Sequence, residues 1–249
     1  MKYPEISVII PCYRESAVIE DSIHSVASYL TDHFERFEII IITDGSPDDT
    51  PTKVHAFGKS NPTMPLKLIS FKHNQGKGAA VKEGVLASRY DPILYIDADL
   101  TIPIEELDYF MSAIKISDIA IASRLVPGAR FEEASPWYRT LLARGFYVLQ
   151  MLLLGNFEYS DTQCGFKLFR RDVGCKLFAQ SRIKRFAFDA ELLFLAKKIE
   201  STVTVLPVRI RKDVRNSNVR MLGDSIDMLG SLLKIKWYDW TGAYQFPKD

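Results

Sequence analysis

The stretch Ile93-Leu94-Tyr95-Ile96-Asp97-Ala98-Asp99 decides the fold prediction. Its four apolar residues predict a short strand buried on both faces, and two carboxylates follow that strand directly. Similar apolar runs occur elsewhere in the first half of the chain, at residues 6–10, 38–43, 66–71 and 118–123. Polar, loop-forming residues come directly after each run, so the sequence indicates a repeated unit of buried strand and polar loop.

Helical spacing fills the intervals between these strands. Apolar residues at 19, 23, 26, 27 and 30 predict one helix, Thr50-Pro51 marks the start of another, and further helices are expected at 78–89 and 104–115. Alternating strands and helices predict an α/β fold with a mostly parallel sheet and right-handed crossovers. In such sheets ligands bind beyond the carboxyl ends of the strands, so the polar loops are expected to line one crevice.

The alternation loosens beyond residue 125. We expect helices at 136–155 and 188–198, a strand at 202–208, and an amphipathic helix at 221–236 that precedes Trp237, Tyr238 and Trp240. Tryptophan and tyrosine favour a membrane interface, and lysine can extend along a helix to reach water. The helices at 136–155 and 221–236 are therefore candidates for interfacial helices, with an ordinary core helix as the alternative for each.

Charge is spread unevenly along the chain. The net charge is +1, but residues 164–220 contain 14 lysines and arginines and 5 acidic residues, a local net charge of +9. A basic segment of this kind indicates an anionic partner, such as phosphates or acidic lipid head groups. The plainer alternative is a solvated basic face.

Membrane spans and metal-binding cysteines are not expected. The longest uncharged run, residues 145–157, is shorter than the roughly 20 apolar residues that a spanning helix needs. The N-terminus lacks the layout of a signal peptide. Cys12, Cys164 and Cys175 have no CxxC spacing, so we interpret them as reduced thiols of a cytosolic protein.

Asp97-Ala98-Asp99 is the strongest chemical signal in the sequence. Two carboxylates at the end of an apolar strand are costly unless a cation neutralises them. Carboxylate oxygens suit Mg²⁺ or Mn²⁺, and Mg²⁺ is commonly held by one or two carboxylates together with substrate phosphates. A solvated Asx turn is the alternative for the tripeptide, which is common by itself.

Two further loops have the chemistry of a phosphate or nucleotide site. Residues 74–78, Asn-Gln-Gly-Lys-Gly, offer backbone amides and one ammonium at a predicted helix N-terminus, although a simple loop explains them equally well. Asp44 ends a predicted strand, where it can accept hydrogen bonds from a base or ribose, or cap the following turn.

Taken in order, these segments resemble the family 2 glycosyltransferases of the GT-A fold, and among them the polyprenyl- and dolichyl-phosphate glycosyl synthases. The resemblance runs from about residue 6 to residue 235. Each motif is modest, but the ordered set is specific. The matching segments are residues 8–15, 43–50, 74–78, 97–99, 123–124, 161–167 and 188–193.

The resemblance implies roles for individual residues. The base and ribose would lie on Pro11, Tyr13, Glu15 and Asp44. The nucleotide-sugar site would also include Gly45, Ser46, Lys77 and Gly78. The segment Asp97-Ala98-Asp99 would contact the donor, with Asp97 and Asp99 binding a diphosphate-bound Mg²⁺ or Mn²⁺. The acceptor phosphate would lie on Ser123, Arg124 and Arg139, and the donor sugar on Gln163 and Asp189.

The implied domain organisation is a GT-A domain at residues 1–220, followed by an amphipathic helix and tail at 221–249. Within the domain, residues 1–125 would form the nucleotide-sugar-binding half and residues 126–220 the acceptor-binding half. The implied reaction is inverting transfer of a hexose, glucose from UDP-glucose, to a polyprenyl or dolichyl phosphate. It would take place peripherally at the cytoplasmic face of a membrane, with no nucleic-acid partner.

Several alternatives stay open on the sequence. GDP-mannose could replace UDP-glucose, and a growing polysaccharide could replace the lipid phosphate. A phosphate acceptor is already anionic and needs little help from a base, whereas a hydroxyl acceptor would need Asp189 or Glu191. A nucleotidyltransferase would need a glycine-rich loop after the first strand, where this chain has Pro-Cys-Tyr-Arg-Glu. A non-catalytic binding protein of the same fold is the remaining rival.

One motif departs from the family pattern. Relatives often carry Ser-Lys-Val near the end of the domain, with the lysine on the donor phosphates, but this chain has asparagine at position 218. The missing charge could come from Arg211, Lys212, Arg215 or Arg220.

Overall fold

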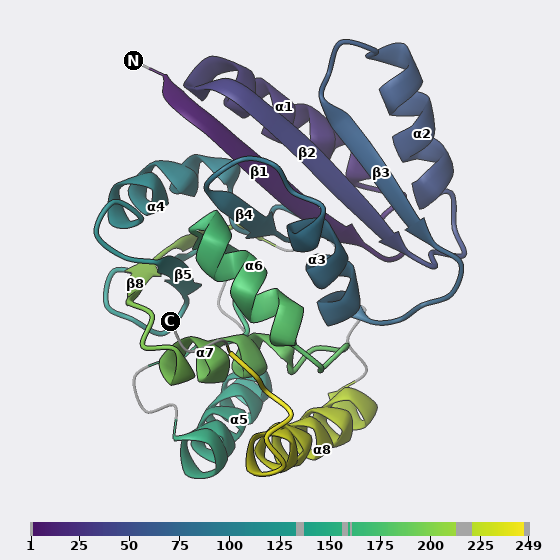
Figure 1. Ribbon diagram of the computed structural model, residues 1–249. Helices are drawn as coiled ribbons and strands as arrows, with labels where there is room; N and C mark the ends of the chain where they lie inside the picture. Colours follow the sequence, from purple (N-terminus) through teal and green to yellow (C-terminus); the bar gives the residue numbers. More distant parts are fainter. Residues whose placement is uncertain (1, 133–136, 156–158, 160, 213–220, 247–249) are drawn as a thin grey trace.

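Figure 1 shows the computed structural model of the chain. The structure describes residues 2–132, 137–155, 159, 161–212 and 221–246. For residues 137–144 and 221–226 it describes the backbone alone. The strands are β1 (Tyr3–Cys12), β2 (Phe34–Asp44), β3 (Leu66–Phe71), β4 (Ile93–Ile96), β5 (Ile119–Ser123), β6 (Arg130–Phe131), β7 (Phe166–Phe169), β8 (Val203–Pro207) and β9 (Arg209–Ile210). The helices are α1 (Ile19–His33), α2 (Thr50–Ser60), α3 (Lys77–Leu86), η1 (Ile104–Glu106), α4 (Leu107–Ala113), α5 (Trp137–Leu154), α6 (Arg171–Gln180), α7 (Phe188–Lys198) and α8 (Met221–Trp240).

A seven-stranded sheet in the order β3-β2-β1-β4-β7-β5-β8 runs through the molecule. Its strands point in one direction, except that β7 is antiparallel to both of its neighbours, β4 and β5. A separate pair of short parallel strands joins β6 to β9. The loops that follow β1 to β5 therefore leave the same edge of the sheet, which confirms the α/β prediction with a mostly parallel sheet.

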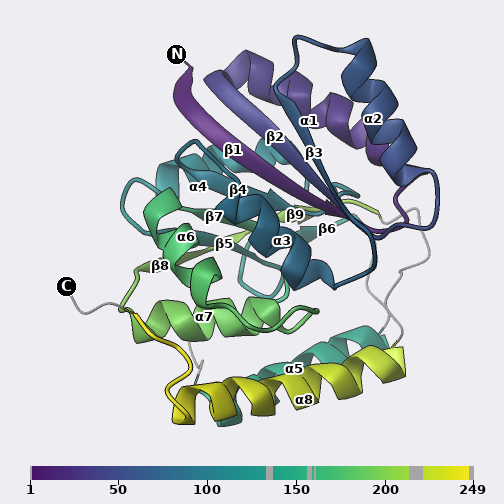
Figure 2. The same cartoon turned by 45° about the vertical axis from the view of Figure 1, so that its right-hand side comes forward.

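Helices cover both faces of this sheet. Val8 and Ile10 of β1 pack into one core with α1, α2 and α4, whereas Ile9 packs into a second core with α3, α6 and α7. Burial on both faces explains why the strands are continuous apolar runs. Helices α5 and α8 pack side by side as an outer layer beneath α7 (Figure 2). No helix of the described residues is long and apolar enough to cross a membrane.

Most predicted elements are present, with ends that differ by up to four residues. The first strand was expected to end before Pro11, but β1 continues to Cys12. A proline is tolerated there because β1 pairs with β4 only through Ser7–Ile9, so the missing N–H of Pro11 lies beyond that ladder. Helix α2 begins at Thr50 and has Asp49 as its N-cap, whereas Thr50 itself was expected as the N-cap.

Strand β7 and helix α6 were not predicted. Strand β7 has only four residues, all buried, and its sequence Phe-Lys-Leu-Phe contains a lysine that hides the apolar pattern. It inserts between β4 and β5, and β8 completes the far side of the sheet. Strands from both sides of residue 125 thus share one sheet, so residues 1–125 and 126–220 do not form separate sheets.

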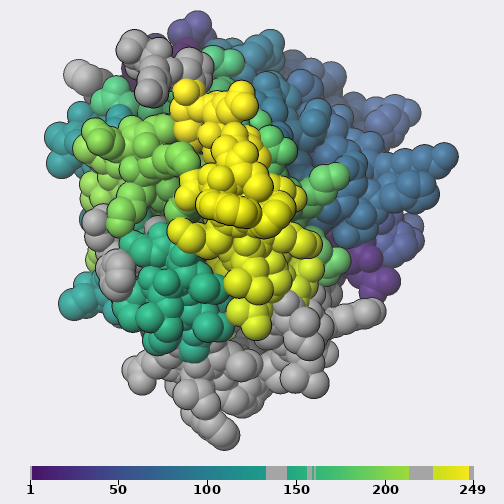
Figure 3. Space-filling view, turned by 60° about the horizontal axis from the view of Figure 1, so that its bottom comes forward, coloured from purple at the N-terminus to yellow at the C-terminus, as the bar shows by residue number. Residues whose placement is uncertain are grey.

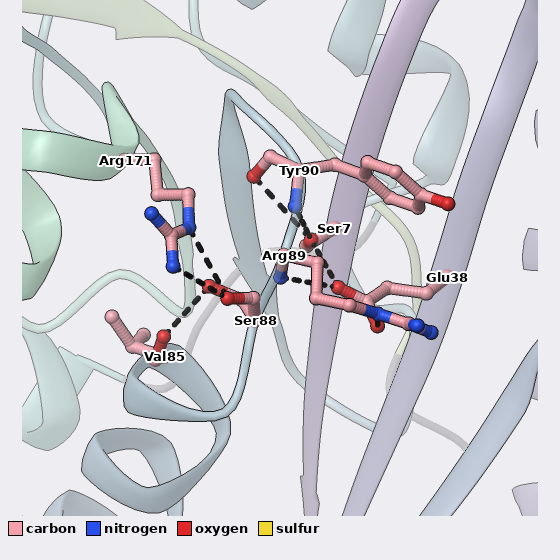
Figure 4. Close-up of polar contacts among 7 residues, drawn as sticks. All are labelled: Ser7, Glu38, Val85, Ser88, Arg89, Tyr90 and Arg171. Atoms are coloured by element: carbon pink, nitrogen blue, oxygen red, sulfur yellow. Dashed lines mark hydrogen bonds and ion pairs between the residues drawn. The ribbon is translucent and has the colours of Figure 1, made fainter.

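The edge of the sheet opposite the predicted crevice holds a buried polar network around Glu38 (Figure 4). Glu38 of β2 is only 1% exposed and accepts hydrogen bonds from Ser7 Oγ (2.7 Å), the backbone N of Arg89 (2.6 Å) and Arg89 Nε (3.2 Å). Arg171 donates two more bonds, through Nε and Nη2, to the carbonyl of Ser88. The network fixes the segment between α3 and β4, and hence the position of β4.

Replacing Glu38 by alanine is expected to lower the free energy of unfolding by about 2–4 kcal/mol, because the buried Ser7 hydroxyl and the backbone N of Arg89 lose a charged acceptor. Urea unfolding of Glu38→Ala measures this loss. The matched control is Glu35→Ala, an exposed glutamate of the same strand, for which we expect a change below about 0.5 kcal/mol. Equal stability of the two variants would contradict the role given to Glu38.

Candidate active site at the carboxyl edge of the sheet

Asp97 lies at the end of β4 and is paired with Lys77, the first residue of α3. The Lys77 ammonium is 2.7 Å from Asp97 Oδ1, and the hydroxyl of Tyr95 donates to the same oxygen (3.3 Å). The backbone N of Asp97 donates to the carbonyl of Gly165 (3.0 Å), so the segment before β7 holds this strand end in place. Burial acts to lower the pKa of Lys77, but Asp97 raises it above its ordinary value.

Asp99 closes a tight turn beyond Asp97. Its Oδ1 accepts hydrogen bonds from the backbone N (3.0 Å) and the hydroxyl (2.5 Å) of Thr101, and Leu100 between them has a φ of +48°. The Asx turn considered as an alternative is therefore present, but it leaves Asp97 and Asp99 together at one strand end. No cluster of three or more His, Cys, Asp or Glu is found among the described residues. Two carboxylates still fit a cation that takes its remaining ligands from substrate phosphates and water.

A second, buried ion pair lies behind the first. Lys167 of β7 contacts Asp189 of α7 at 2.5 Å and the carbonyl of Cys164 at 2.6 Å, and the side chains of Lys167 and Asp189 are 1% and 3% exposed. The ammonium groups of Lys77 and Lys167 lie 5.4 and 5.7 Å from the centre of the Tyr95 ring. Burial raises the pKa of Asp189, and the positive charge of Lys167 counteracts that shift. The two pairs thus place alternating charges around one aromatic ring.

Asp44 binds backbone amides of the loop before α3. Its carboxylate is buried and accepts hydrogen bonds from the backbone N of Gln75 (2.6 Å) and Gly76 (2.8 Å). Asp44 therefore anchors the loop before α3, and two of the loop amides predicted to suit phosphate already have a partner. The alternative was that Asp44 caps the turn after β2. Its carboxylate bonds instead to the loop that follows β3.

The loops after β1 and β2 are joined by hydrogen bonds. Ser46 Oγ accepts from the backbone N of Arg14 (2.8 Å), and Thr50 Oγ1 accepts from that of Glu15 (2.9 Å). Asp48, for which no role was predicted, accepts from Ser16 N (3.3 Å) and Thr50 Oγ1 (2.7 Å). The predicted base-and-ribose residues therefore belong to one connected wall. Pro11 is buried, Tyr13 is half-buried, and Gly45 has a φ of +61°.

Arg124 follows β5 and is bound by Asp161. Its backbone N and Nε donate to Asp161 Oδ2 (2.9 and 2.8 Å), and its Nη2 donates to Oδ1 (2.9 Å). Asp161 lies in the matching segment 161–167, but the resemblance implied no role for it. Ser123 is buried, and its hydroxyl accepts from the backbone N of Leu125 (3.2 Å). Arg139 lies in the first turn of α5, and its side chain lies outside the described residues.

Three other expected residues have clear surroundings. Gln163 donates to Thr162 Oγ1 (3.2 Å) beside the site. Gly78 is buried where a Cβ would overlap Phe188, so the close packing of α3 on α7 requires glycine. Glu191, the alternative base for a hydroxyl acceptor, is fully buried. It accepts from the backbone N of Arg182 and Ile183 and from the Tyr244 hydroxyl, so it anchors the C-terminal segment and does not reach the crevice.

Two of the four candidates to replace the missing family lysine are described. The backbone N of Arg211 donates to the carbonyl of Thr101 (2.8 Å), directly beside the Asp99 turn, while its Nη2 lies 3.4 Å from Glu105. The backbone N of Lys212 donates to Glu132 (3.1 Å). Arg211 is therefore the described candidate closest to the turn. Positions 215, 218 and 220 lie outside the described residues.

Known proteins resemble this chain in both sequence and fold. Residues 7–178 match the sequence model of Glycosyl transferase family 2. A dolichyl-phosphate beta-glucosyltransferase of Dictyostelium discoideum is 31% identical in an alignment 253 residues long, which covers 96% of this chain and 76% of that protein. The dolichyl-phosphate beta-glucosyltransferase of Homo sapiens is 29% identical, over 97% of this chain and 78% of that protein.

A solved structure gives the same architecture. The glucosyl-3-phosphoglycerate synthase of Mycobacterium tuberculosis, in complex with Mn²⁺, uridine-diphosphate-glucose and phosphoglyceric acid, superposes with a TM-score of 0.66 at 19% identity. The superposition covers 94% of this chain and 80% of that chain. That likeness concerns the fold, and the family follows from the sequence match. With more than half of its length matched, the chain belongs to Glycosyl transferase family 2.

Proposed function

We propose that this glycosyltransferase moves glucose from UDP-glucose to a polyprenyl or dolichyl phosphate, with inversion at the anomeric carbon. The observation that carries the proposal is the similarity, over nearly the whole chain, to proteins named dolichyl-phosphate beta-glucosyltransferase. The carboxyl edge of the sheet supports it, because it gathers paired carboxylates, ammonium groups and a guanidinium at one place. In this proposal residues 1–125 serve mainly the donor and residues 126–220 mainly the acceptor.

In the proposal a divalent cation, Mg²⁺ or Mn²⁺, is held by Asp97 and Asp99 together with the donor diphosphate. When bound, such a cation compensates the negative charge of the departing diphosphate. Support comes from the two carboxylates at one strand end and from the Mn²⁺ and UDP-glucose bound to the neighbour of the same fold. Lys77, which lies 2.7 Å from Asp97, adds positive charge for the same phosphates.

The other proposed contacts orient the two substrates. The wall that contains Pro11, Tyr13 and Glu15, with Asp44, Gly45 and Ser46 behind it, binds the base and ribose, and Gly78 lines the donor site. Gln163 and Asp189 face the sugar, and the ion pair with Lys167 keeps Asp189 in one orientation. Ser123, Arg124 and Arg139 bind the acceptor phosphate. Because a phosphate monoester is already anionic near neutral pH, positioning and charge compensation supply most of the catalysis.

The outer helices offer a surface for the membrane that carries the lipid acceptor (Figure 3). Four large apolar residues of α8 are spaced along one side of the helix and are 41–79% exposed. This apolar stripe consists of Leu229, Leu233, Trp237 and Trp240. Leu152 of the adjacent helix α5 is 69% exposed, and Lys234 and Lys236 are exposed on α8. Helices with tryptophan, leucine and lysine in this arrangement lie in membrane interfaces, so the enzyme would bind peripherally to the cytoplasmic face.

Asp99→Asn tests the proposed cation site. We expect hexose transfer in the presence of Mn²⁺ to fall by at least about 100-fold, because the charge of the departing diphosphate is no longer compensated. Release of UDP from UDP-glucose in the presence of a polyprenyl phosphate gives the measurement. Asp172→Asn, an exposed aspartate of α6, is the matched control and should keep full activity. Full activity in Asp99→Asn would remove the cation assignment.

Thermal unfolding tests the donor. A ligand at about 100 times its dissociation constant stabilises the folded state by about 2.7 kcal/mol, so UDP-glucose with Mn²⁺ should raise Tm by several degrees. GDP-mannose with Mn²⁺ should give a much smaller shift, and Asp99→Asn should lose the part of the shift that depends on Mn²⁺. A larger shift with GDP-mannose than with UDP-glucose would favour the mannose alternative.

Flotation with vesicles of phosphatidylcholine and phosphatidylglycerol tests the membrane surface. We expect the protein to float, and the triple variant Leu233→Ser/Trp237→Ser/Trp240→Ser to partition at least about tenfold less, because it loses buried apolar area at the interface. The control is Ile116→Ser, which removes an apolar residue that is 83% exposed outside α5 and α8. Flotation of the triple variant at the level of the control would exclude the apolar stripe as the docking surface.

A further inference from the structure

The ion pair between Arg124 and Asp161 is unequal in its exposure. The Asp161 side chain is 4% exposed, whereas that of Arg124 is 40% exposed. By comparison, both side chains of the Lys167–Asp189 pair are buried, at 1% and 3% exposed. In the Arg124 pair the carboxylate is buried behind the guanidinium, and the guanidinium reaches the surface.

The hydrogen bonds of this pair fix the plane of the guanidinium. Nε donates to Asp161 Oδ2 at 2.8 Å and Nη2 to Oδ1 at 2.9 Å, which is the bidentate fork geometry of an arginine and a carboxylate. The backbone N of Arg124 donates to Oδ2 as well (2.9 Å), so the carboxylate is also fixed relative to the end of β5. Within the described part of the chain, Nη1 is the guanidinium nitrogen for which no protein acceptor is found.

Arg124 lies within electrostatic range of Asp97 in the crevice. Burial acts to lower the pKa of Arg124, but the hydrogen bonds and charge of Asp161, with a smaller contribution from Asp97, raise it above its ordinary value. Burial acts to raise the pKa of Asp161, and the bonds from Arg124 keep it below its ordinary value. Both groups therefore stay charged near neutral pH, and Asp97 is close enough to act on Arg124.

We propose that Asp161 is a positioning residue that fixes one edge of the Arg124 guanidinium, so that the other edge receives the phosphate monoester of the acceptor. This inference rests on the proposed function, in which Arg124 binds that phosphate. Arginine loses conformational freedom when it binds a ligand, and a side chain already fixed in its bound orientation loses less. The buried carboxylate fixes one edge of the guanidinium, and the Arg124 side chain still remains 40% exposed.

The test separates the affinity for acceptor from the affinity for donor. Asp161→Asn keeps the size of the side chain and one acceptor oxygen but removes the charge and half of the fork. We expect the KM for a short, water-soluble polyprenyl monophosphate to rise on the order of tenfold, the effect of one lost charge-assisted hydrogen bond. The KM for UDP-glucose should stay within about twofold. Arg124→Lys, which cannot form the fork, should show the same selective effect.

The matched control is Asp118→Asn, at the other end of β5. The Asp118 carboxylate accepts from Thr202 N and Oγ1 (both 2.8 Å) and lies 4.0 Å from Arg170 Nε, so it also joins a strand end to a neighbouring segment and an arginine. Asp118→Asn is expected to lower Tm without changing the KM for the polyprenyl monophosphate. This variant measures what a purely structural carboxylate of the same strand contributes.

The outcomes are distinguishable. If the wild-type protein transfers glucose to the monophosphate and Asp161→Asn lowers Tm with an unchanged acceptor KM, Asp161 is a structural clamp and the positioning role is overturned. Equal increases in the KM for donor and acceptor overturn it as well. If the wild-type protein transfers no sugar to any polyprenyl monophosphate, the proposed function fails and the positioning role fails with it.

Discussion

Compensation of charge around Tyr95 is the constraint on which the carboxyl edge of the sheet depends. Two carboxylates and two ammonium groups lie close together there, and each carboxylate contacts one ammonium. A buried charge without a partner would cost several kcal/mol, so the buried pair of Lys167 and Asp189 cannot lose a member without a large penalty, whereas the side chains of Lys77 and Asp97 are 24% and 34% exposed. Strand β7 makes the arrangement possible, because its antiparallel insertion between β4 and β5 carries Lys167 into the middle of the sheet. Asp97 and Asp99 can then follow the short strand β4.

Carboxylates at this edge hold neighbouring loops as well as offering charge. Asp44 binds the amides before α3, Asp48 joins the loops after β1 and β2, and Asp161 holds Arg124. Each of these contacts links segments that are far apart in the sequence, so the loops form a pre-organised wall. Such pre-organisation suits a transferase whose acceptor needs little activation, because orienting the substrates is then the main contribution of the protein.

Helix α7 connects the site to the outer helices. Its second residue, Asp189, forms the ion pair with Lys167, and its buried apolar side chains share one core with Leu232 and Ile235 of α8. The loop before it also contacts α8, because Arg185 Nε lies 3.2 Å from Asp227. The proposed membrane surface and the proposed acceptor site therefore belong to one packed unit. A lipid whose phosphate reaches Arg124 from the membrane is compatible with that arrangement.

The sequence by itself determined the alternation of strands and helices, the direction of the sheet and the edge at which the polar residues gather. These features follow from local hydrophobic periodicity and from the handedness of crossovers, which neighbouring residues specify. Only the tertiary structure decided which polar groups are satisfied by the protein itself. The sequence offered Asp44 and Glu191 as carboxylates that could contact substrate. In the structure, both accept hydrogen bonds from backbone amides of other segments. The partnership of Asp161 with Arg124 was missed because pairing between distant side chains leaves no periodic signal in the chain, and strand β7 was missed because its four residues include a lysine.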